Sequence, residues 1–215
     1  MNLTVIPYRT FVQKRDTIRK MVVVDRRIQR TRKTLHEALM ALVLEGLYDT
    51  ITVQQILDRA NIGRSTFYTH FQDKDELLMW GTQHLRTTLS AAQQERDASA
   101  AASPERIIYF SRAMFDHANG YRKIYRALVN SAVWPHVRQR IQNILAELIR
   151  RECETVKRSQ RSKSKLPLEL FVHYLAATLM TVMTWWVDHK NSLSAEEIDQ
   201  VYRVLVLPSI RSAFA

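Results

Sequence analysis

The residues best suited to binding chemistry lie in the segment RSTFYTHF, residues 64–71. If this segment is helical, Phe67 and Phe71 share one face, while Ser65 and Thr69 point to the opposite side. The aromatic face is expected to pack inward. The outward residues are short and polar, so a helix that carries them fits deep into the major groove of DNA and forms hydrogen bonds with base edges. The pattern therefore predicts a DNA-reading helix.

The side chains around this face have their own expected partners. Arg64, at the start of the helix, is placed to reach a guanine edge or a phosphate, and Tyr68 to donate to a phosphate. Thr66 lies on a flank and is short enough to sit near bases. Lys74 stands beside the first turn of the next helix. Its ammonium and the free backbone N–H groups there would together bind another phosphate.

A helix this short needs neighbours to hold it, and the sequence predicts them. Apolar periodicity and breaks in it predict helices over residues 27–45, 52–60, 64–71 and 73–96. Capping boxes begin two of them, Thr52 with Gln55 and Asp73 with Glu76. Gly46 stands where a left-handed cap would end the first. A bracing helix followed by two short helices and a tight turn is the helix-turn-helix layout.

The second half of the chain continues the helical pattern without any strand alternation. Five more helices are expected, over residues 104–118, 121–130, 134 to the basic run 157–165, 167–190 and 194–210. Only four Gly and five Pro in 215 residues disfavour β-sandwiches and barrels. The prediction is an all-α protein of about nine helices. Its parts would be an N-terminal arm (1–24), a helix-turn-helix domain of three to four helices (25–78) and a C-terminal helical domain for ligand binding and dimerisation (79–215).

The net charge of +11 is unevenly distributed. Residues 1–34 carry ten Lys and Arg against two Asp, a net of +8, and residues 150–165 carry seven against two Glu, a net of +5. The remainder is slightly acidic. A basic arm that leads into a helix-turn-helix favours DNA over a membrane surface as the partner. The run 157–165 is interpreted as a solvated loop between helices.

The N-terminus has two interpretations. The first 20 or so residues show no clean helical period, so they are either a disordered basic arm or an upstream start, before Met21, that the functional protein does not need. No secretory signal is visible, and the expected location is the cytoplasm. The lone Cys153 excludes an intrachain disulfide. Nothing assembles a nucleophile with a base or a metal-ligand set, so we expect neither an enzyme nor a cofactor.

From about Thr31 to Leu78 the sequence resembles the tetracycline-repressor-like (TetR/AcrR) family of bacterial transcription regulators. The resemblance is carried by EGLYDTITVQQILDRA, NIGRSTFYTHF and DKDELL. It implies phosphate contacts at Thr52, Tyr68 and Lys74. It places near the bases Arg64, Ser65, Thr66, Thr69 and His70. Gly63 stands where the family usually has a capping Ser or Thr, so a weaker cap is expected, and Ser65 stands where the family often has Gly.

In such regulators the C-terminal helices dimerise, which implies a homodimer joined through about residues 167–213. A physical argument agrees: residues 170–187 are apolar nearly all round and need burial on two sides, one of which a partner subunit supplies. As a membrane span this stretch is marginal. The resemblance also implies an effector pocket, whose available lining residues are Phe110, Met114, Phe115, His117, Tyr121, Tyr125, Trp134, Tyr174, Met183 and Trp186. The alternative is that they form ordinary core.

These observations lead to one expected function and one alternative. The first is a homodimeric transcription regulator that represses by binding an inverted-repeat DNA operator and responds to a small-molecule effector. The alternative is a DNA-binding dimer whose C-terminal half is a protein-interaction module without a ligand.

Overall fold

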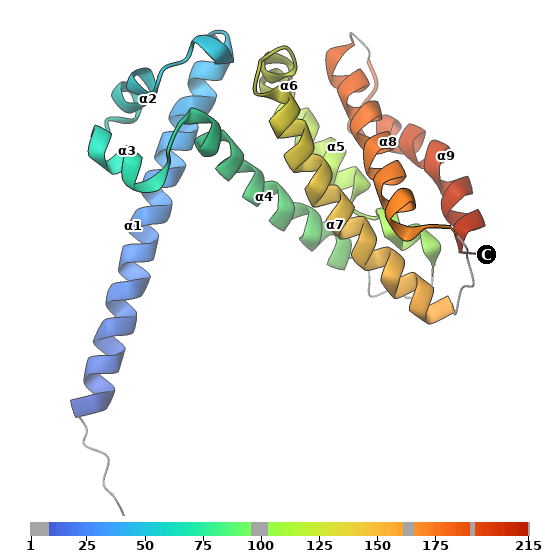
Figure 1. The fold of residues 1–215 in the computed structure, drawn as a ribbon, viewed down its shortest axis with the longest axis horizontal. Coiled ribbons are helices and arrows are strands. Elements are labelled where there is room, and N and C mark those ends of the chain that lie inside the picture. The colour runs from blue at the N-terminus through green and yellow to red at the C-terminus, as the bar shows by residue number, and fades with distance from the viewer. Residues whose placement is uncertain (1–8, 96–102, 161–165, 190–191, 215) are drawn as a thin grey trace, which may run out of the picture.

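The structure is a computed structural model that describes residues 9–95, 103–160, 166–189 and 192–214, with side chains from residue 26 onward except 159–160. Within these ranges the chain forms nine α-helices, two short 3-10 helices and no strand (Figure 1). The elements are α1 (Arg9–Glu45), η1 (Tyr48–Thr50), α2 (Val53–Ala60), α3 (Arg64–His70), α4 (Lys74–Glu95), η3 (Pro104–Ile108), α5 (Ser111–Gly120), α6 (Arg122–Val129), α7 (Trp134–Gln160), α8 (Leu168–Asp188) and α9 (Ala195–Ala213). The predicted all-α class is confirmed.

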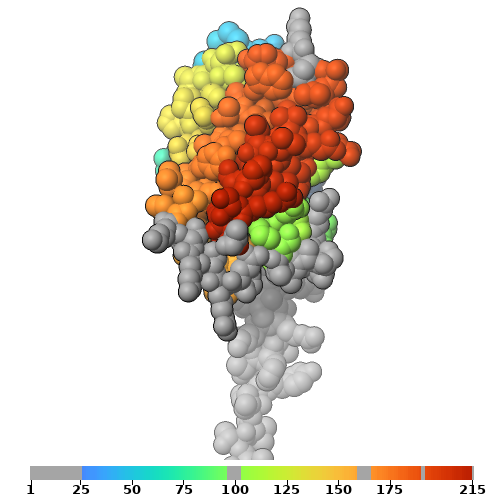
Figure 2. All heavy atoms as spheres, turned by 90° about the vertical axis from the view of Figure 1, so that its right-hand side faces the viewer, coloured from blue at the N-terminus to red at the C-terminus, as the bar shows by residue number. Residues whose placement is uncertain are grey.

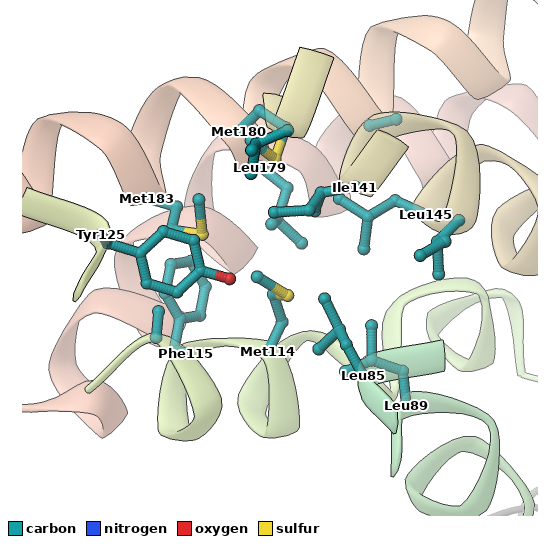
Figure 3. Close-up of a cluster of buried hydrophobic side chains, with 14 of the residues drawn as sticks. Leu85, Leu89, Met114, Phe115, Tyr125, Ile141, Leu145, Leu179, Met180 and Met183 are labelled. Carbon is teal, nitrogen blue, oxygen red and sulfur yellow. The ribbon is translucent and has the colours of Figure 1, made fainter. Parts of the chain in front are cut away.

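The helices divide into two groups that α4 connects. Helices α1 to α3 and the start of α4 form one group, and α5 to α9 form the other (Figure 1). The domain boundary expected after residue 78 therefore falls inside a continuous helix. Farther along α4, Leu85 and Leu89 point into the same buried cluster as Ile141 and Leu145 of α7 (Figure 3). Helix α4 thus contributes buried side chains to both groups of helices.

Helix α1 begins earlier than predicted. The expected start was near Arg27, but the helix runs from Arg9, so most of the segment interpreted as an arm is helical, while residues 1–8 lie outside the described part. Periodicity missed this stretch because it detects a buried face. The first residues of α1 show no apolar period in the sequence, so the pattern does not indicate a helix there.

Two local predictions are also wrong. The expected helix 104–118 is split into η3 and α5, because the buried side chain of Gln93 replaces helical bonds there. Its amide donates to the carbonyl of Arg106 at 2.6 Å and accepts from the N–H of Phe110 at 3.1 Å. The left-handed cap expected at Gly46 is absent. In the described residues the one positive φ belongs to Asn61, at 52°.

Helix α6 is bonded to both groups of helices. Next to its end, the N–H of Ala132 donates to the carboxylate of Asp49 in η1, at 3.2 Å to each oxygen. The guanidinium groups of Arg122 and Arg126 donate to the carbonyls of Trp186 and Val187 at 2.7 Å. These carbonyls end α8, where cations are favoured by the helix dipole. The η1 turn is therefore linked through α6 to the end of α8.

Gly81 permits the crossing of α1 and α4. A Cβ built at this position would lie 2.1 Å from Nε2 of His36, a partly buried ring that contacts Trp80 edge-on with ring centroids 5.7 Å apart. The close approach therefore requires a residue without a side chain at position 81.

We expect Gly81→Ala to destabilise the protein by about 1–2 kcal/mol, because the clash outweighs the better helix propensity of Ala. Urea unfolding measures the change. Adding His36→Ala should recover part of the loss. The control Gly120→Ala, where nothing lies within 4 Å of the added Cβ, should change the stability by less than about 0.5 kcal/mol. A Gly81→Ala variant as stable as that control would contradict the packing assigned to Gly81.

Candidate DNA-binding surface

The turn between α2 and α3 is built as the sequence predicts. Thr52 and Gln55 form the reciprocal capping box that begins α2. Asn61 adopts the left-handed conformation that ends α2, and its N–H donates to the carbonyls of Leu57 and Asp58. Asn tolerates this conformation because its short polar side chain costs little there. Three residues thus reverse the chain between the two helices, which is the helix-turn-helix geometry.

Two aromatic rings hold α3 against its neighbours. Phe67 is fully buried and Phe71 nearly so, with ring centroids 5.9 Å apart. Phe71 also meets Trp80 of α4 edge-on at 6.3 Å. The predicted inward aromatic face is confirmed, and burial of these two rings fixes the rotation of α3 about its own axis.

The opposite face of α3 is open to solvent. Its exposed residues are Arg64, Ser65, Thr66, Tyr68 and Thr69. The hydroxyl of Thr69 donates to the carbonyl of Ser65 at 2.9 Å, so its lone pairs remain available to accept. The Arg64 guanidinium lies 5.7 Å from the centroid of the Tyr68 ring, which keeps this cation at the rim of the surface. The face therefore offers one guanidinium and four hydroxyl groups, suited to base edges and phosphates.

The two ends of α3 differ in how they are held. Gly63 is its N-cap and makes no side-chain capping bond, which agrees with the weaker cap expected from the sequence. At the other end, His70 is half-buried on the flank facing α1, away from Ser65 and Thr69. Burial, together with the charge of Arg32, lowers its pKa below the usual value. His70 therefore lies beside the reading face and presents a neutral ring.

Lys74 has a structural role that the sequence interpretation missed. Its ammonium donates to the carbonyls of Tyr48, Asp49 and Ile51 at 2.9, 3.2 and 2.8 Å. It also lies 4.7 Å from the centroid of the Tyr48 ring. All three N–H donors are thus directed at the η1 loop. These bonds make Lys74 a cation that closes the loop. A phosphate bound at Lys74 would have to compete with them, and the phosphate contact stays a prediction.

The first turn of α4 is capped by carboxylates. The Asp73 carboxylate accepts from the N–H of Glu76 at 2.7 Å, and the Glu76 carboxylate accepts from the N–H of Gln72 at 2.6 Å. These carboxylates already occupy the site where the helix dipole favours an anion. A phosphate at this helix start would have to compete with these carboxylates, and the expected phosphate site stays a prediction.

Tyr48 is the structural residue that the sequence interpretation overlooked. Its ring is 1% exposed, and its hydroxyl donates to the Asp75 carboxylate at 2.5 Å. Burial, with the hydrogen bond to Asp75, raises its pKa, so the phenol stays protonated. A buried tyrosine with charged partners on α4 joins η1 to α4. The apolar-aromatic pair in EGLYDT could have indicated from the sequence that Tyr48 is buried, but it does not reveal which residues Tyr48 contacts.

The ten candidate effector residues do not share one environment. Seven are buried in the C-terminal core: Phe110, Met114, Phe115, Tyr125, Trp134, Met183 and Trp186. Figure 3 shows the Tyr125 hydroxyl directed into the cluster that contains Met114 and Met183. His117 is partly buried, and burial lowers its pKa to about 4. Tyr121 and Tyr174 are 45% and 41% exposed, so these two side chains lie at the surface rather than in the buried cluster.

The two best-formed hollows of the described surface lie away from the ten candidate effector residues. The larger of the two best-formed ones has a volume of about 410 Å³ and lies between α4, η3 and α7. Its wall is polar and includes Gln93, Arg106 and Glu152, and the last two form an ion pair at 2.8 Å. The other hollow, about 20 Å³, lies beside Phe171 and Phe214.

Comparison with known proteins supports this geometry. The sequence model described as "Bacterial regulatory proteins, tetR family" matches residues 35–79, and the model "Transcriptional regulator C-terminal region" of the same family matches residues 105–206. The chain belongs to the TetR family. This TetR-family chain therefore has a DNA-binding helix-turn-helix domain and a helical C-terminal domain. All eight predicted DNA contacts, from Thr52 to Lys74, fall inside the first match.

Individual relatives are distant in sequence. YxbF of Bacillus subtilis, an HTH-type transcriptional regulator, is 24% identical over 196 residues, which are 86% of this chain and 49% of YxbF. The chain thus spans about half the length of that relative. Among solved structures, a TetR-family regulator from Syntrophomonas wolfei has a TM-score of 0.71 at 18% identity, covering 85% of this chain and 96% of its own. Thermus thermophilus FadR, a repressor solved with lauroyl-CoA, has a TM-score of 0.59 at 18% identity, covering 82% and 93%.

Removing the ammonium of Lys74 distinguishes the two roles of this residue. We expect Lys74→Met to lower the free energy of unfolding by about 2–3 kcal/mol, since three carbonyls lose a charged donor. The salt dependence of DNA binding should stay unchanged. Arg138→Met, on the exposed surface of α7, is the stability control and should change little. If the variant is as stable as the wild type, and the slope of log affinity against log salt falls by about 0.9 per protomer, Lys74 contacts a phosphate instead.

Proposed function

We propose that this chain is a homodimeric repressor that reads an inverted-repeat DNA operator with the outward face of α3. The observation that carries the proposal is the exposed row of hydroxyls and one guanidinium, held outward by burial of Phe67 and Phe71. Short side chains let the helix axis approach the base edges closely. Residues 25–78 would supply DNA binding and residues 79–215 the dimer and its regulation, in the cytoplasm where the DNA is.

Within the surface, two kinds of contact have different consequences. Ser65 and Thr69, at the centre of the outward face, and the short Thr66 on its flank are assigned to base edges. Tyr68, on the other flank, and Thr52, the N-cap of α2, are assigned to phosphates, which fix the register of the protein on the duplex without reading sequence. Arg64, next to Tyr68, is assigned to a guanine edge or a phosphate.

The dimer is proposed to form through the exposed sides of α8 and α9. Ten side chains of α8 are buried in the protein, and its length and apolar composition would also allow a membrane span. Its outward side keeps Leu170 and Trp185 62% and 46% exposed, and α9 keeps Val204 and Leu205 73% and 51% exposed. Figure 2 shows α8 in orange and α9 in red side by side on one face. Such a two-helix apolar face fits a second copy in a four-helix interface.

Thr178 and Thr181 make this face less polar than its sequence suggests. Their hydroxyls donate to the carbonyls of Tyr174 and Ala177 within α8, at 2.8 and 2.9 Å. Their methyl groups are therefore available to continue the apolar surface. At the seam between α8 and α9, the hydroxyl groups of Tyr174 and Ser209 lie 3.4 Å apart. Two-fold symmetry of this interface would present two copies of α3 to an inverted repeat.

A small-molecule effector is proposed to act through the core of the C-terminal domain. Met114, Met180 and Met183 meet there, and methionine side chains repack readily around an inserted apolar group (Figure 3). The FadR repressor was solved with lauroyl-CoA, an apolar chain on a polar carrier. Ligand entry would shift α6 and α4. Movement of either helix would change the spacing of the two α3 copies, and repression would end because two half-sites about one turn apart tolerate little mismatch.

Selection of duplexes from a randomised library tests the assigned function. The full chain should enrich an inverted repeat, and Thr69→Ala should lose about 1 kcal/mol of discrimination at one base pair in each half-site. The control Thr87→Ala removes the same kind of hydroxyl-to-carbonyl bond on the exposed face of α4 and should select the same operator as the wild type. Enrichment of no sequence by the wild type would overturn the proposal.

Placing a charge on the α8–α9 face tests the dimer. Val204→Glu should raise the dimer dissociation constant at least about 100-fold, because an unpaired carboxylate would be buried at the interface. Light scattering after size exclusion gives the mass. Leu47→Glu is the matched control, since Leu47 is also 73% exposed but lies beside η1, and it should remain dimeric. A dimeric Val204→Glu variant would place the interface elsewhere.

A further inference from the structure

Helix α1 extends well beyond the domain that it braces. Among the residues of α1 whose side chains the structure describes, Leu35 is the first that is fully buried, and Arg32, three positions earlier, contacts the Phe71 ring. Residues 9–31 lie before these contacts, and at 1.5 Å per residue they reach about 35 Å. Figure 1 shows this part of α1 projecting past α3, away from the C-terminal helices. We refer to residues 9–33 as the α1 extension.

The extension is strongly and asymmetrically basic. It contains ten Lys and Arg and only two Asp. Five basic positions, 15, 19, 26, 30 and 33, fall within an arc of about 60° around the helix axis. In the part with described side chains, Arg26, Arg27 and Arg30 are exposed. The basic row is therefore exposed at Arg26, Arg30 and Lys33, and positions 15 and 19 fall on the same side of the helix axis by periodicity.

The extension starts at the reading surface. The Arg32 guanidinium lies 5.8 Å from the centroid of the Phe71 ring, directly after the end of α3. Its charge also contributes to the lowered pKa of His70, the last residue of α3. A duplex held against the outward face of α3 would therefore have the extension beside it.

An isolated helix of this composition is a poor structure by itself. Its clustered like charges at helical spacing repel one another, which weakens the helix when it stands alone. A polyanion removes that repulsion, whereas a second copy of the extension would increase it. The reach of about 35 Å also matches one turn of B-DNA, about 34 Å.

We propose that the α1 extension is a second DNA contact that lies along the phosphate backbone outside the half-site read by α3. This inference rests on the proposed function and adds a partner surface to it. The contact is independent of sequence, so it strengthens specific and non-specific binding alike. Each phosphate neutralised adds about 0.9 to the salt slope, the change in log affinity per unit of log salt.

The test compares two triple variants of the full chain. The first is Arg26→Gln, Arg27→Gln and Arg30→Gln in the extension. The matched control is Arg138→Gln, Arg140→Gln and Arg151→Gln, three exposed arginines of α7. Both lose the same charge and no buried contact, and circular dichroism checks that both are folded. Each is bound to an 80-bp duplex that carries the selected operator and to a 60-bp duplex of arbitrary sequence, over a range of salt concentrations.

Hydroxyl-radical footprints of the wild type and the control should extend about 10 bp outside each half-site. The extension variant should keep the central footprint, lose the flanks, and lower the salt slope on both duplexes by about 2–3 per protomer. Wild-type protection that ends at the half-sites, or equal slopes for the two variants, would overturn the inference and leave the proposed function intact. Loss of any central footprint in the wild type would instead overturn the proposed function. A change in oligomeric mass without a change in slope would assign the extension to a protein contact.

Discussion

Burial of Phe67 and Phe71 is the constraint on which the DNA-binding surface depends. Helix α3 has seven residues and an N-cap without a side-chain bond, so it has little stability of its own. The two rings supply that stability through contact with the rest of the domain. They also set the rotation of the helix, and thereby select which five residues face outward. One packing interaction thus determines both the existence of the reading helix and its chemistry.

The same surface is coupled to the rest of the molecule by polar contacts at η1. Tyr48, Lys74 and Asp75 join this loop to the start of α4, and Asp49 accepts from the N–H of Ala132 next to α6. Both helices continue into the C-terminal core, and α6 holds the end of α8. Polar contacts therefore join η1 both to the start of α4 and, through α6, to the end of α8.

Local signals predicted most of the fold, and tertiary contacts account for the errors. The capping box at Thr52 and the ring spacing in α3 required only neighbours in sequence, and the structure contains them. The break before α5 depends on Gln93, and the role of Lys74 depends on carbonyls more than twenty residues away. The start of α1 was missed for a different reason, since its residues show no apolar period in the sequence. Residue type alone does not reveal such partners.

Directed cleavage from α3 tests the central claim that this helix lies in the major groove. The single cysteine, Cys153, is fully buried, so Ser65→Cys would introduce one accessible thiol to which iron-EDTA can be attached. Bound to a selected operator, this conjugate should cut both strands inside each half-site. A conjugate at Arg138→Cys, on the exposed surface of α7, should leave the duplex intact. No cleavage from position 65, or the same weak pattern from both positions, would contradict the account.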